Sequence, residues 1–92
     1  MIIEISPKRA QKLANIGITV VAAKKVENGI GHVATVASGF EFNADKGPVM
    51  ANVGGSDKQG LKTAADAFRG TYYADGKVKF YFSLKDFVKA IF

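Results

Sequence analysis

The chain has 92 residues, 48% of them hydrophobic, and its seven phenylalanines and three tyrosines can fill a core, so we expect one compact domain over residues 1–92. Cysteine is absent, which excludes disulfides, thiolate metal sites and thiol catalysis. The formal net charge of +5 favours anionic partners through long-range attraction.

The N-terminal stretch Met1-Ile2-Ile3-Glu4-Ile5 has no basic segment and no long apolar run. This pattern is typical of neither a signal peptide nor a membrane span. We therefore expect a cytoplasmic location and no membrane partner.

The first elements follow in chain order. A strand is predicted over residues 2–5, and Ser6-Pro7 then opens a helix, since serine is a preferred N-cap and proline suits the first helical position. Gly17 is expected to end this helix. The solvent side of the helix carries a first basic cluster, made of Lys8, Arg9 and Lys12.

Residues 18–42 form the predicted centre of the fold, a long β-hairpin that turns at Asn28-Gly29 and runs on through Phe40 and Phe42. Asn-Gly is a strong turn signal, because a type I′ turn needs positive φ at both central positions. Both faces are apolar near the base, which places the hairpin in the middle of a sheet. The predicted cross-strand pairs are Lys25–His32, Ala23–Ala34 and Val21–Val36 on one face and Lys24–Val33, Ala22–Thr35 and Val20–Ala37 on the other.

The second half of the chain predicts a strand over residues 49–53 and a helix with a Ser56/Gln59 capping box. The apolar stripe of this helix is Leu61, Ala64, Ala65 and Phe68, with Gly70 as its stop. A second hairpin over residues 71–82 is predicted to turn at Asp75-Gly76. A final helix over residues 83–91 completes the chain.

The predicted order is thus β-α-β-β-β-α-β-β-α, an α+β fold with a mostly antiparallel sheet and helices packed on one face. Part of this order resembles ferredoxin-like domains, including the RNA-recognition modules, and Gly39-Phe40-Glu41-Phe42 is similar to the aromatic core of their third-strand motif. No basic residue immediately precedes Gly39, and the first strand lacks an aromatic residue for base stacking. The extra strand and the last helix also fall outside that plan, so we assign the chain to no family.

Catalytic and metal-binding patterns are missing from the sequence. His32 is the sole histidine, and the eight acidic residues are dispersed along the chain. Gly54-Gly55-Ser56 lacks the spacing and the lysine of a P-loop, and the following Asp57 would repel phosphate. We therefore expect a protein that is not an enzyme and that carries no metal and no cofactor.

The clearest candidate site is a basic-aromatic face on the second hairpin. Pairing across Asp75-Gly76 would set Tyr72 opposite Lys79 and place Lys77 and Tyr81 on the same side. Lysines neutralise phosphates, and tyrosine rings stack on unpaired bases. The same residues are also ordinary for a sheet edge, where lysines discourage aggregation. The candidate binding residues are Tyr72, Lys77, Lys79 and Tyr81, together with Lys8, Arg9 and Lys12 of the first helix.

Two main functions follow as hypotheses. The first is a small basic binding protein that engages nucleic acid, or an RNA- or DNA-bound protein complex, through this face. The second is an inhibitor that blocks a single protein target by direct contact, as small phage and mobile-element proteins such as anti-CRISPR proteins do. An enzyme with a dispersed carboxylate site is a third, less favoured alternative.

Overall fold

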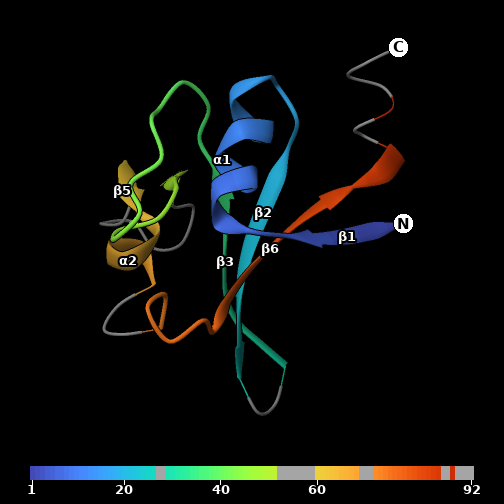
Figure 1. Cartoon of the computed structure of the whole chain (residues 1–92). Helices are drawn as coiled ribbons and strands as arrows, with labels where there is room; N and C mark the ends of the chain where they lie inside the picture. The colour runs from blue at the N-terminus through green and yellow to red at the C-terminus, as the bar shows by residue number, and fades with distance from the viewer. Residues whose placement is uncertain (27–28, 52–59, 69–71, 86–87, 89–92) are drawn as a thin grey trace.

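The computed structural model describes residues 1–26, 29–51, 60–68, 72–85 and 88 (Figure 1). It contains an antiparallel sheet and two helices, an α+β class. In this described part of the chain, no helix is long and apolar enough to cross a membrane. The elements in chain order are β1 (Ile2–Ile5), α1 (Pro7–Asn15), β2 (Val20–Val26), β3 (Gly29–Val36), β4 (Val49–Ala51), β5 (Leu61–Thr63), α2 (Ala64–Ala67) and β6 (Val78–Ser83).

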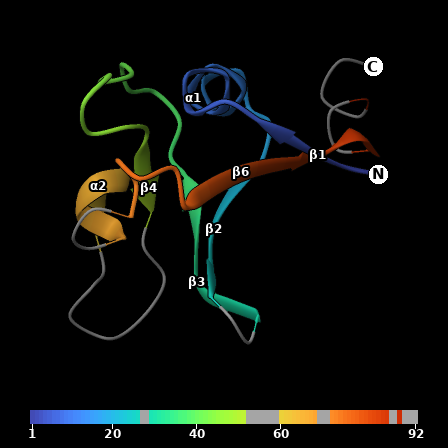
Figure 2. The same cartoon turned by 60° about the horizontal axis from the view of Figure 1, so that its bottom comes forward.

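The six strands lie in the order β1-β6-β2-β3-β4-β5, and every neighbouring pair is antiparallel. The last strand of the chain therefore lies between β1 and β2. Because both of these strands run antiparallel to β6, they are parallel to each other, and α1 connects them across β6. Figure 2 shows α1 above β6 and β2, with the β2–β3 hairpin extending away from it.

The first strand and helix confirm the sequence prediction. Ile3 and Ile5 are half-buried in β1, and Ile2 and Glu4, which alternate with them, are exposed. The Ser6 hydroxyl accepts a hydrogen bond from the Arg9 amide at 3.3 Å, as an N-cap does. Gly17 follows the helix with φ +95°, a conformation that favours glycine.

The central hairpin is confirmed as a pair of strands in the middle of the sheet, but its predicted register was wrong by one residue. Ala22 pairs with Ala34, not with Thr35, and Lys24 pairs with His32. A bulge follows between Lys24 and Lys25. Near the turn Val26 pairs with Gly29, so Gly29 belongs to β3 and not to the turn as predicted. Asn28, the other predicted turn residue, lies outside the described residues.

The physical reason for this register is burial. Val20 and Ala22 of β2 and Ala34 and Val36 of β3 are all at most 5% exposed. The observed pairing puts them on one face of the sheet, whereas a slip by one residue would turn one strand's set toward the other face. The register is therefore set by burial of these residues in the shared core, and not by the local preference of Asn-Gly for a turn.

Two further predictions were wrong, and others fall on residues that the structure does not describe. β3 ends at Val36, so Phe40 and Phe42 lie in a loop, because the chain leaves the sheet at Ser38-Gly39 and Gly39 adopts φ +90°. Leu61–Thr63 is a strand paired with β4, and α2 spans only Ala64–Ala67. The Ser56/Gln59 capping box and Gly70 lie outside the described residues, as does most of the predicted C-terminal helix, of which residues 84, 85 and 88 are helical.

The prediction of a second hairpin was also wrong, although the predicted turn at Asp75-Gly76 is present. Gly76 has φ +73°, and the Lys77 amide donates to the Tyr72 carbonyl at 2.9 Å, which closes a turn over residues 72–77. Residues 72–74 are not a strand. β6 pairs with β1 and β2, whose longer apolar strands offer it two partners.

The core lies on one face of the sheet, here called the covered face. Phe80 and Met50 are fully buried there, and Ala10 and Ala14 of α1 pack against them. The helical residues Ala64 and Ala67 belong to the same cluster. The covered face thus holds the contacts of both described helices.

A buried polar residue joins α1 to the sheet. Gln11 is 1% exposed; its Nε2 donates to the Ala37 carbonyl at 2.8 Å, and its Oε1 accepts the Val49 amide at 2.8 Å. The same Nε2 donates to Asn15 Oδ1 at 2.9 Å, and this oxygen also accepts the Gly39 amide at 2.8 Å. One side chain therefore holds both ends of the loop between β3 and β4.

We predict that Gln11→Leu lowers the free energy of unfolding by about 2–4 kcal/mol, because the Ala37 carbonyl and the Val49 amide both lose their side-chain partner. Chemical denaturation measures this change. Lys12→Leu, at the adjacent exposed position of α1, is the control and should change the free energy by less than about 0.5 kcal/mol. Equal values for the two variants would contradict the role given to Gln11.

A second prediction concerns Gly47, which has φ +83° and lies against Tyr73. A Cβ at Gly47 would lie 2.5 Å from Tyr73 Cζ, whereas a Cβ at Gly39, with φ +90°, would meet nothing within 4 Å. Both alanine variants carry backbone strain of about 1–2 kcal/mol, and Gly47→Ala adds the clash. In thermal or chemical unfolding, Gly47→Ala should be the more destabilising, and Tyr73→Ala should abolish the difference.

Candidate functional site

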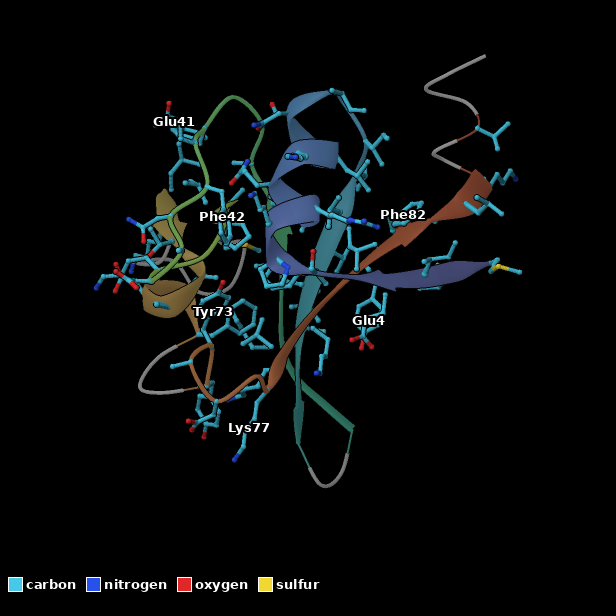
Figure 3. The ribbon with its side chains drawn as sticks, in the orientation of Figure 1. Glu4, Glu41, Phe42, Tyr73, Lys77 and Phe82 are labelled. Carbon is cyan, nitrogen blue, oxygen red and sulfur yellow. The ribbon has the colours of Figure 1, made fainter. Side chains whose placement is uncertain are left out.

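The structure divides the predicted basic-aromatic face between two sides of the sheet. Tyr72 and Lys77 lie in the turn that precedes β6, and Figure 3 shows Lys77 below Tyr73. Lys79 and Tyr81 lie within β6, and they alternate with the buried Val78 and Phe80. They therefore face away from the core.

The first-helix cations form a separate group. Lys8, Arg9 and Lys12 are all exposed on α1, which packs on the covered face. Lys79 and Tyr81 lie on the opposite face of the sheet. The seven predicted site residues thus do not make one continuous surface.

Two lysines converge on one tyrosine ring. Lys24 Nζ lies 4.1 Å from the centroid of the Tyr72 ring, and Lys77 Nζ lies 6.0 Å from it. This is cation–π geometry, with two ammonium groups close to the same ring. We call Lys24, Tyr72 and Lys77 the lysine–tyrosine cluster.

The sequence analysis missed Lys24 because it did not predict that β2 lies beside β6, which follows the turn that holds Tyr72. In the observed register Lys24 lies opposite Val78 on β6 and opposite His32 on β3, on the covered face. It therefore reaches Tyr72, which follows α2 on the same side. Alternation with the buried Ala22 was the sequence signal that could have placed it there.

His32 packs against an aromatic ring. Its ring centroid is 5.0 Å from that of Phe68, with an interplanar angle of 74°. Its Nε2 is buried and has no hydrogen-bond partner among the described residues. Its cross-strand neighbour is Lys24, and not Lys25 as predicted. The contacts given by the structure are those of a packing residue.

The second face of the sheet, here called the open face, bears no helix in the described part of the chain. Among the residues whose side chains the structure describes on this face, the charged ones are Glu4 and Lys79, and Glu4 Oε2 lies 4.0 Å from Lys79 Nζ. These two charges are opposite and offset each other. The strand register assigns to this face Ile2, Glu4, Val21, Ala23, Val33, Thr35, Val49, Ala51, Leu61, Thr63, Lys79, Tyr81 and Ser83.

A hollow of about 510 Å³ lies in the open face. Ile2, Val21, Ala23, Val33 and Tyr81 line it from four neighbouring strands. Tyr81 pairs with Glu4 on one side and with Val21 on the other, so it lies among these lining residues. Ile2 is 68% exposed and Val33 is 43% exposed. The side chains of Ile2, Val21, Ala23, Val33 and Tyr81 form an apolar surface, here called the apolar strip, that no described element covers.

A second cleft, of about 650 Å³, lies between the start of α1 and the turn before β6. Tyr73 lines it, and burial raises the pKa of the Tyr73 hydroxyl, so this phenol stays neutral at physiological pH. The ring packs edge-on against Phe80 at 6.4 Å, and Figure 3 shows it beside α2. Tyr73 is therefore tied to the core and is not poised as a base.

Among the described residues, no three histidine, aspartate or glutamate side chains come together as metal ligands. Comparison with known proteins adds no functional assignment. No protein-family model, no curated protein and no solved structure matches this chain. The surfaces described above are therefore the basis on which a function is proposed.

Proposed function

We propose that this chain is a small binding protein, without a catalytic role, that docks on a partner protein through its open face and blocks that partner by direct contact. One observation carries the proposal, namely the uncovered apolar strip with its hollow. Large apolar areas that remain exposed are typical of sites of protein interaction.

The chemistry of the open face favours a protein over a nucleic acid. The charges described on it, Glu4 and Lys79, are opposite and lie close to each other, so together they offer phosphates no net attraction. Its hollow instead suits bulky apolar side chains from another protein. Tyr81 is the natural anchor, because half-buried tyrosines surrounded by apolar residues are enriched at interaction hot spots.

The charge of the rest of the chain indicates what kind of partner it would be. The net charge is +5, while the two charges described on the open face offset each other. The described cations of α1, namely Lys8, Arg9 and Lys12, lie on the exposed side of that helix and not on the open face. An acidic protein with an exposed apolar patch would be attracted at long range by these cations and held at short range by the hollow.

This proposal predicts that Val33→Asp weakens partner binding at least about tenfold and that Tyr81→Ala weakens it about thirtyfold, the cost of a hot spot. The partner is first captured from nuclease-treated host extract and then purified for titration with each variant. Ile16→Asp makes a similar change at a residue that is 66% exposed at the end of α1, and it should bind like wild type. Equal binding by folded Val33→Asp and Ile16→Asp proteins would reject the proposal.

A second candidate, binding of nucleic acid or of a nucleoprotein complex, rests on the lysine–tyrosine cluster. Two ammonium groups that share one ring repel each other, and a phosphate between them would relieve that repulsion. Tyr72 is 37% exposed, and Lys24 lies over its ring, so base stacking is confined to the remaining surface. The cluster is thus better suited to phosphate contact than to reading bases.

For this candidate, Lys24→Ala and Lys77→Ala should each flatten the salt dependence of binding to a single-stranded oligonucleotide by about one unit or less. Lys79→Ala is the control, since Lys79 lies on the other face beside Glu4. Fluorescence titration at two salt concentrations measures the slopes. If wild type binds no oligonucleotide even at low salt, direct nucleic-acid binding is excluded.

A further inference from the structure

The outer side of β1 is an edge of the sheet, because β6 is its only neighbour among the described strands (Figure 1). The Leu84 amide donates to the Met1 carbonyl at 2.9 Å, so Met1 and Leu84 are a hydrogen-bonded pair. Every second pair along the ladder is of the same kind, which makes Ile3–Phe82 and Ile5–Phe80 hydrogen-bonded pairs as well. In an antiparallel pair, alternate residues turn both backbone groups toward the partner. The backbone N–H and C=O groups of Ile2 and Glu4 therefore point away from β6, to the free edge.

This edge has few of the features that normally prevent strand pairing. Natural edge strands carry lysine, proline or a bulge. β1 has the sequence Ile-Ile-Glu-Ile, and its register with β6 is regular throughout. Glu4 is its only charged residue, and Ile2 is 68% exposed.

We propose that β1 pairs with β1 of a second copy of this chain, in an antiparallel arrangement about a two-fold axis normal to the sheet. Outward-pointing residues must pair with outward-pointing residues, which leaves few registers. One register opposes Glu4 to Glu4 of the second copy, and like charges directly opposite are unfavourable. The register centred on Ile3 instead sets Ile2 opposite Glu4 of the second copy, and its symmetry repeats this pair.

Charge and size decide how strong this dimer is. Four residues of strand make a small contact, so we expect association at roughly 100 µM and above. Each copy carries a net charge of +5, and salt screens their mutual repulsion. The dimer should therefore tighten with added salt, which is opposite to the behaviour of nucleic-acid binding.

Sedimentation equilibrium of the full chain, between about 10 µM and 1 mM at high salt, tests the proposal. Ile2→Pro removes the outward N–H without removing a bond to β6, so it should abolish the dimer, whereas Ile2→Val should keep it. Val33→Asp changes the open face away from β1 and should leave the dimer unchanged, so this test is separate from that of the proposed function.

A charge pair tests the register. Ile2→Lys would place a cation opposite Glu4 of the second copy and should tighten the dimer severalfold, while Ile2→Glu should loosen it severalfold. These two variants keep the proposal testable if Ile2→Pro fails to fold, which circular dichroism would show. A wild type that stays monomeric at 1 mM, equal dimerisation of Ile2→Pro and Ile2→Val, or equal strength of the two charged variants would overturn it.

Discussion

The amide of Gln11 is the constraint on which the arrangement of the layers depends. It is buried at the centre of the α1 interface and satisfies one backbone group at the end of β3 and another at the start of β4. Buried polar groups are costly unless they are paired, so this geometry holds α1 in one position relative to the sheet. Asn15 extends the same network to the loop that follows β3, through the Gly39 amide and the Phe40 carbonyl.

With α1 held in this way, the two faces of the sheet differ in character. The covered face packs the core, and its margin carries the lysine–tyrosine cluster. The open face keeps apolar side chains at the surface, and its described charges are the Glu4–Lys79 pair, 4.0 Å apart. The described part of this basic chain therefore presents one mainly apolar surface and one cationic one, which recognise different chemistry. This separation is why protein contact and phosphate contact are proposed at different places.

Much of the local structure could be predicted from short-range chemistry. Ser6, Pro7 and Gly17 bound the first helix because each suits a particular backbone position at a helix end. Asp75-Gly76 is a turn because Gly76 adopts positive φ. The presence of the two central strands was also predicted, although the second ends at Val36 and not beyond it, since their apolar β-branched residues favour extended structure wherever they pair.

The sequence by itself thus determined where the chain turns and where several elements begin, because those signals act over a few residues. Only the tertiary structure decided which strands are neighbours. β6 joined β1 and β2 rather than residues 72–74, and Leu61–Thr63 became a strand because β4 was there to pair with it. The register of the hairpin followed from burying Ala22 against Ala34, and the pairing of β6 with β2 brought Tyr72 to Lys24. Adjacent apolar residues such as Ala22 and Ala23 look alike in sequence, and only the packed core distinguishes the face to which each belongs.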